Sequence, residues 1–268
     1  MDKKKRKKMF AVFAAVILAC FIGSLAVRSG GSGESISEMM RDAVLHETNK
    51  ISLFGLTEVN PSLISAYVVT TLIFIFSLIV RIFVIPRFKL VPGRFQTVME
   101  TVVSFFDGLA KSNSPHLNGF LGAYLFAAGV YICIGTLFEL LGVQAVTTTG
   151  ASISLPAPLA DINGAIMMGC LSYLVIMSGA IAVNKLRGVG LTLKEFSLPV
   201  SMSFRLFGAL LSGALVTELV YYSPALSYGL PVLVGVLFTV LHALIQAYVL
   251  TLITALFYGE VSEPKIKK

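Results

Sequence analysis

The sequence predicts an all-α polytopic membrane protein with five core membrane helices and one extra N-terminal helix. Of its 268 residues, 56% are hydrophobic and only 13% are charged, whereas a soluble domain has about 25% charged residues. Six apolar segments approach the roughly 20 residues that a membrane-spanning helix needs: 9–27, 62–86, 117–142, 161–184, 197–222 and 230–258. The net charge is +7, and the basic residues that cause it lie between the apolar segments. They therefore indicate membrane topology and no nucleic-acid partner.

The basic residues predict the orientation. If the N-terminus is cytoplasmic, most of the 21 Lys and Arg residues lie inside, and the outside receives only Arg28, Arg41 and Lys50. Because basic loops stay on the cytoplasmic side, we expect both termini there.

The first segment has two interpretations. A basic start followed by a short apolar core is typical of a signal peptide, and "ILAC" resembles a lipoprotein cleavage site. We favour a retained signal-anchor helix, and its removal would leave five helices in the same orientation. The expected organisation is an N-terminal region (1–35), an outside amphipathic segment (36–60), a membrane domain (61–260) and a basic cytoplasmic tail (261–268).

The segment after the second apolar run has apolar residues at helical spacing. We expect it to lie along the cytoplasmic interface. Its apolar residues are Phe95, Val98, Met99, Val102, Val103, Phe106 and Leu109. Cys20, Cys133 and Cys170 lie in apolar segments without metal-binding spacing, so no metal or cofactor is expected.

Arg205 is an arginine within the fifth apolar segment. An ionisable group in a membrane helix costs at least about 2.5 kcal/mol, so it indicates function unless its charge reaches the headgroups by snorkelling. The residues sharing its helical face are all small, which a snorkelling arginine does not require and a closely packed partner helix does. They are Ser201, Gly208, Ala209 and Ser212. Since guanidinium stays protonated, Arg205 suits a fixed counter-charge for a carboxylate.

Other polar residues lie near the expected outer ends of these helices. Glu139, Asp161 and Glu218 could converge into a wet, cation-attracting entrance, or could simply reach the outer interface. His242 and Gln246 are one turn apart on the last helix. If that helix is antiparallel to its predecessor and Gln246 is level with Arg205, His242 is level with Ala209. His242 then either handles protons or is a hydrogen-bonded packing residue.

Five motifs resemble subunit a of F-type ATP synthases, in the family's order over roughly residues 60–258. "SMSFRLFGALLSG" resembles S-x-x-x-R-L-F-G-N-x-x-A-G-E, and "LIQAYVLTLITALFY" resembles the closing L-I-Q-A-F motif around Gln246. "PLADINGAI", with Asp161 and Asn163, is similar to P-[ST]-x-D-[LV]-N-x-T. "KLRGVGLTLKEF" is similar to the cytoplasmic loop, and "TLFELLG" stands where the family has F-x-x-x-N-L-x-G.

The resemblance implies a non-catalytic stator subunit in a bacterial-type plasma membrane. Its expected partners are a ring of c-subunits, the b-subunit stalk, the rest of the complex and membrane lipid. Two half-channels for H⁺ or Na⁺ would meet the ring on either side of Arg205, which matches the family's essential arginine. The ring-facing surface would be the small residues around Arg205.

The sequence departs from the family pattern where the channel groups should lie. Ala209, Ala214 and Thr239 replace an Asn, a Glu and an acidic or His residue, and Glu139 replaces an Asn. We therefore expect relocation, in which Glu139 and Glu218 supply the entrance carboxylates and His242 supplies polarity beside Ala209.

Two other classes of function were considered. A secondary transporter or ion carrier could use the same buried charges, but no two matching halves are visible. An intramembrane enzyme would need a nucleophile and base or clustered metal ligands, and the motifs typical of those sites are missing from the sequence.

Overall fold

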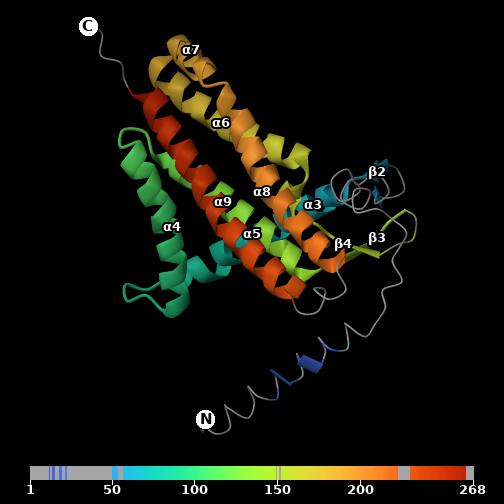
Figure 1. The fold of residues 1–268 in the computed structure, drawn as a ribbon. Coiled ribbons are helices and arrows are strands. Elements are labelled where there is room, and N and C mark those ends of the chain that lie inside the picture. The colour runs from blue at the N-terminus through green and yellow to red at the C-terminus, as the bar shows by residue number, and fades with distance from the viewer. Residues whose placement is uncertain are drawn as a thin grey trace.

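The computed structural model describes residues 50–53, 57–148, 150, 152–222 and 230–263, with isolated positions between 12 and 22. The side chains at 218, 221, 222 and 231 are not described. Five helical spans in this part of the chain are long and apolar enough to cross a membrane, which confirms the predicted fold class (Figure 1). They are Pro61–Arg87, Gly119–Leu141, Ile162–Asn184, Ser197–Thr217 and Val232–Ser262. The interpretations of 1–35 and of most of 36–60 lie outside the described residues.

The elements follow one another with short connections. The helices are α3 (Pro61–Ile79), α4 (Arg94–Asn113), α5 (Gly119–Phe138), α6 (Ile162–Asn184), α7 (Leu186–Lys194), α8 (Ser197–Tyr222) and α9 (Leu230–Ser262). Single turns of π- or 3-10 helix are η1 (Val80–Val84), η2 (Ile85–Arg87), η3 (Glu139–Leu141) and η4 (Pro158–Ala160). The strands are β1 (Ile51–Leu53), β2 (Thr57–Val59), β3 (Gln144–Val146) and β4 (Ser152–Ser154).

Local sequence explains both ends of the first described span. Asn60 precedes α3, and its Oδ1 accepts a hydrogen bond from the Ser62 N–H at 3.0 Å, while Pro61 occupies the first turn. At the other end, Pro86 has no N–H to donate, so the regular helix gives way to η1 and η2 there.

Helix α9 continues to Ser262, beyond the predicted end at residue 258, because other elements satisfy its last carbonyls. His116 Nε2 lies 2.8 Å from the Ser262 carbonyl oxygen, and Asn184 Nδ2 donates to the Val261 carbonyl at 2.9 Å. A Cβ at Gly259 would collide with the Asn113 carbonyl, so glycine is required where α9 meets the end of α4.

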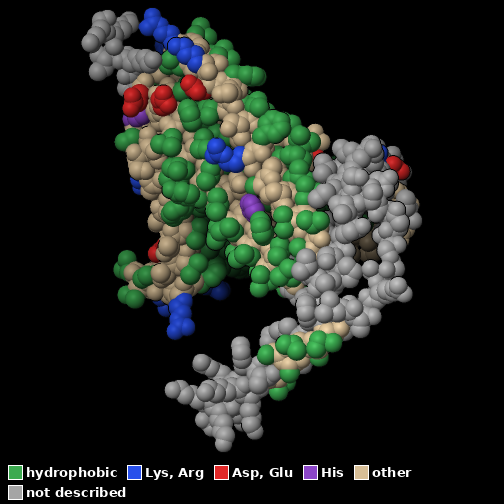
Figure 2. Space-filling view, viewed as in Figure 1, with side chains coloured by type: hydrophobic (Ala, Val, Ile, Leu, Met, Phe, Trp, Pro, Cys, Tyr) green, Lys and Arg blue, Asp and Glu red, His purple; other side chains and the backbone are tan. Residues whose placement is uncertain are grey.

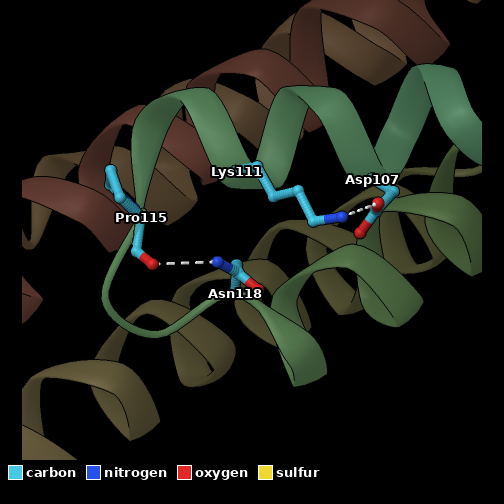
Figure 3. A network of polar contacts seen from close by, with 4 residues as sticks. All are labelled: Asp107, Lys111, Pro115 and Asn118. Carbon is cyan, nitrogen blue, oxygen red and sulfur yellow. Dashed lines mark hydrogen bonds and ion pairs between the residues drawn. The ribbon is translucent and has the colours of Figure 1, made fainter.

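The amphipathic helix predicted after the second segment is α4. It packs against α5 and α9 (Figure 1). Lys111 Nζ lies 2.6 Å from Asp107 Oδ2 on its exposed side, and Asn118 Nδ2 donates to the Pro115 carbonyl at 3.0 Å in the following turn (Figure 3). Phe106 is buried among α5 residues.

Two short hairpins were not predicted from the sequence. β1 pairs antiparallel with β2, and β3 pairs antiparallel with β4. They also contact each other, since the Thr148 N–H donates to the Lys50 carbonyl at 3.0 Å. Strands of three residues carry too little periodicity to be recognised in sequence.

Helices α8 and α9 lie side by side and pack against α6 and α5, which form the layer behind them (Figure 1). The buried core joins α4, α5, α6, α8 and α9. Gly169 lets α6 approach α8 closely, because a Cβ there would collide with Ser203 Oγ and lie 2.7 Å from the Pro199 carbonyl oxygen. This contact therefore fixes the position of the first turns of α8.

We expect Gly169→Ala to destabilise the protein by about 1–3 kcal/mol, since the new methyl group meets backbone that cannot yield. Thermal unfolding of the purified protein in detergent measures this loss. Gly235→Ala in α9 is the matched control, because its Cβ would meet no atom within 4 Å. Equal unfolding temperatures for the two variants would contradict close α6–α8 packing.

Candidate functional site: a cavity beside Arg205

A cavity of about 380 Å³ opens between the C-terminal half of α8, the N-terminal half of α9 and the end of α5. Its α8 wall is made of small residues at helical spacing, notably Ala209, Gly213 and Ala214, and this absence of side-chain bulk opens the space. Thr217, Thr239 and Ser154 add hydroxyl groups. The cavity can therefore hold water, which needs both room and polar partners.

Glu139 and His242 bring two ionisable groups to this one cavity, from η3 and α9 respectively. Glu139 is half-buried, and its carboxyl group makes no hydrogen bond or ion pair within the described part of the chain. Burying a carboxylate without a partner is costly, so the group needs water or a proton from the cavity.

The contacts of His242 indicate which of its ring nitrogens carries the proton. Nδ1 lies 2.8 Å from the Phe238 carbonyl oxygen, which can only accept, so Nδ1 carries a proton and donates it. In the neutral ring Nε2 is then a proton acceptor, and it has no partner among the residues that the structure describes. The ring stacks on Phe238 at a centroid distance of 5.7 Å, which fixes its orientation.

His242 and Ala209 line the same cavity, while their equal level stays a prediction. Arg205 lies one turn before Ala209 on α8, and a turn advances about 5.4 Å. The cavity therefore begins about one helical turn beyond Arg205.

Arg205 itself lies on the exposed face of α8 and makes no ion pair with any described residue. Around it, Ser201, Gly208 and Ser212 are exposed as well, and a Cβ at Gly208 would meet no atom within 4 Å. The chain itself gives no packing reason for this glycine. Over α8 and α9 this face carries mainly hydrophobic and uncharged side chains (Figure 2).

Gln246 lies one turn beyond His242 and is only 7% exposed. Its Oε1 is buried and accepts no hydrogen bond from the described residues. An unsatisfied buried acceptor costs about 1–3 kcal/mol, so a hydrogen-bond donor that reached Gln246 Oε1 would stabilise it. Glu218 belongs to α8, but its side chain is not described.

Asp161 and Asn163 do not join Glu139. They line a separate cavity of about 740 Å³ between α3, α5 and α6, where Asn163 Nδ2 lies 3.4 Å from Asp161 Oδ2. The predicted convergence of three carboxylates is therefore not found for Asp161. Asp161 directly precedes α6, and this end of α6 borders the cavity that residues of α3 and α5 also line.

Three residues that line the α8–α9 cavity were missed in the sequence analysis. They are Gly213, Thr217 and Ser154. Small residues at 209, 213 and 217 repeat every four positions, and this spacing could have revealed the cavity wall on α8. Ser154 comes from β4 and has no local signal, because only tertiary packing brings that hairpin to the cavity.

These features define a multi-pass membrane protein with ionisable groups on and beside its last two helices. Comparison with known proteins identifies the family. A family model described as "ATP synthase A chain" matches residues 63–259, and this chain belongs to that family. It is therefore a membrane channel component of the ATP synthase complex in the plasma membrane.

Two similar relatives are both named "ATP synthase subunit a". One, from Cereibacter sphaeroides strain ATCC 17025 / ATH 2.4.3, is 25% identical over 183 residues, which cover 64% of this chain and 70% of the relative. The other, from Cereibacter sphaeroides strain ATCC 17029 / ATH 2.4.9, has the same identity and coverage.

If the cavity holds water, a cysteine at Ala214 will react with a charged, water-soluble thiol reagent. We expect labelling about tenfold faster than at Ala243→Cys, because the reactive thiolate forms only where water reaches the sulfur. Ala243 lies on the same stretch of α9 but is fully buried and outside the cavity. Both variants are made after Cys20, Cys133 and Cys170 are replaced by Ala, and equal rates would show that the cavity is dry.

Proposed function

We propose that this chain is the stator of an F-type ATP synthase, facing a rotating ring of c-subunits across the exposed face of α8. Ions, H⁺ or Na⁺, pass through two half-channels, turn the ring and drive ATP synthesis in partner subunits. The observation that carries this proposal is the position of Arg205. It is exposed among small residues, has no ion pair with any described residue, and lies one turn from a cavity with polar groups in its wall.

In this proposal Arg205 is the counter-charge for each passing c-subunit carboxylate. Opposite charges 4 Å apart attract by about 4 kcal/mol at an effective dielectric constant near 20. That energy favours the ionised carboxylate by about a thousandfold, since 1.36 kcal/mol corresponds to a factor of ten. Because guanidinium cannot release its proton, Arg205 also blocks direct proton transfer between the half-channels.

The cavity between α8 and α9 serves as the outer half-channel. Glu139 and His242 take the place of the groups lost at Ala214 and Thr239, and Glu218 adds a second carboxylate at the outer end. Support comes from the shared cavity, in which Glu139, Ala214 and Thr239 all line one space. A carboxylate reaching this space from η3 can pass protons as one on α8 would.

The small residues around Arg205 give the ring a surface along which it slides. Gln246 offers its unsatisfied Oε1 as an acceptor near the end of the path.

The chain itself is non-catalytic, the b-subunit stalk holds it, and both termini face the cytoplasm. Residues 61–260 form the membrane domain, with 1–35, 36–60 and 261–268 outside it.

Arg205→Ala should reduce ion-driven ATP synthesis by the complex to background, because the passing carboxylate loses its counter-charge. The measurement is ATP synthesis in membrane vesicles after an imposed ion gradient. Arg187→Ala in α7 removes the same charge away from the membrane face and should leave synthesis unchanged. Normal synthesis by Arg205→Ala would contradict the proposal and favour a transporter that uses the same charges.

Replacing Glu139 and Glu218 together by Gln should abolish coupled ion flow, measured by quenching of a pH-sensitive dye in vesicles. Adding Ala214→Glu to this double variant should restore part of the flow, because residues 139 and 214 line the same cavity. Glu195→Gln, just after α7, is the control and should behave as the unaltered chain does. Near-normal coupling in the double variant would disprove relocation.

A further inference from the structure

A basic turn joins α3 to α4 and has no part in the proposed ion path. η2 ends at Arg87 and α4 begins at Arg94, and the turn between them borders a cavity of about 580 Å³. Arg87 is both the last residue of the span Pro61–Arg87 and part of the cavity lining. The cavity therefore lies at the membrane surface where that span ends.

The cavity is strongly cationic. Arg87, Lys89 and Arg94 all line it, all are exposed, and none of them makes an ion pair with the residues that the structure describes. Glu100, one turn beyond Gln96 on α4, does not line the cavity, and its Oε1 accepts a hydrogen bond from Gln96 Nε2 at 2.7 Å. The cavity therefore offers three positive charges to an anion.

Gln96 holds the turn in one shape. Its Oε1 accepts from the Lys89 N–H at 3.1 Å, and its Nε2 donates to the Lys89 carbonyl at 2.9 Å. Both backbone groups of Lys89 are thus bound to α4 by one side chain. A site held in this way loses less conformational entropy when it binds a ligand.

The same turn exposes large apolar side chains. Leu90 is 105% exposed and Val91 is 83% exposed, directly between the basic residues. Phe95 and Val98 continue this apolar surface along α4, at 48% and 60% exposed. Apolar side chains beside basic ones are typical of a segment that lies at the level of the lipid headgroups.

We propose that this turn binds the headgroup of an anionic phospholipid. The phosphodiester oxygens contact Arg87, Lys89 and Arg94, and the acyl chains lie along Leu90 and Val91. Free phosphate could use the same three cations, but it would leave both apolar side chains in water. The apolar surface therefore favours lipid as the source of the phosphate.

The test is native mass spectrometry of the full chain in neutral detergent, titrated with phosphatidylglycerol or phosphatidylcholine of identical acyl chains. One basic residue near an anionic headgroup contributes about fivefold in affinity, so three contribute about a hundredfold. We expect the triple variant Arg87→Gln/Lys89→Gln/Arg94→Gln to lose about that factor for phosphatidylglycerol and to bind phosphatidylcholine unchanged.

Two further variants separate a built site from general surface charge. Lys185→Gln/Arg187→Gln/Lys194→Gln removes three exposed charges around α7 and should retain phosphatidylglycerol binding within about threefold, as expected for charges beyond the screening distance. Gln96→Leu leaves the net charge unchanged but frees the turn, and should weaken binding about fivefold, as expected for one lost backbone clamp. Circular dichroism checks that each variant keeps its helix content.

Three outcomes would overturn the proposal. Equal losses in both triple variants would mean that only the net charge attracts the lipid. Displacement of phosphatidylglycerol by inorganic phosphate at equal concentration would mean that the turn binds free phosphate. Equal amounts of phosphatidylglycerol copurifying with intact ATP synthase carrying the unaltered chain or the Arg87/Lys89/Arg94 variant would mean that another subunit covers the turn.

Discussion

The structure depends on one electrostatic constraint, which is that a permanent charge within a membrane helix needs a partner. Arg205 has no carboxylate partner among the described residues of its own chain. Hydrocarbon cannot solvate a guanidinium, so its counter-charge must come from the headgroups or from another subunit. The chain belongs to a family of ATP synthase subunits, and the proposed function takes the second source. In that proposal, the small residues around Arg205 let the other subunit approach.

In the proposed function, the cavity next to Arg205 replaces the channel groups that this sequence lacks. A proton can use any ionisable group that reaches a cavity with water in it, whichever helix carries that group. Small residues on α8 make room, and η3 brings Glu139 into that room from the end of α5. His242 is oriented by Phe238, so the cavity has a fixed acceptor as well as a carboxyl group.

Contacts elsewhere in the bundle hold α8 and α9 in position. Close α6–α8 contact at Gly169 positions α8, and His116 and Asn184 hold the end of α9. None of these residues lines the α8–α9 cavity, but a displaced α8 would also displace Arg205. On the opposite edge, α3 and α4 expose apolar side chains to lipid.

The sequence alone determined the fold class, the five spans and the family motif around Arg205. Long apolar segments and a lone arginine are local signals, because the bilayer imposes a fixed length and a fixed cost for charge. It also predicted a helix at α4, through apolar residues at helical spacing, while the location of that helix at the cytoplasmic interface stays a prediction.

Tertiary structure decided which polar residues meet. Glu139 and His242 are about a hundred positions apart, and no local pattern brings them to one cavity. Asp161 looked equivalent to Glu139 in sequence, yet it lines the cavity between α3, α5 and α6 and not the one between α8 and α9. The end of α9 was likewise set by His116 and Asn184, since a helix terminus depends on which distant groups satisfy its last carbonyls.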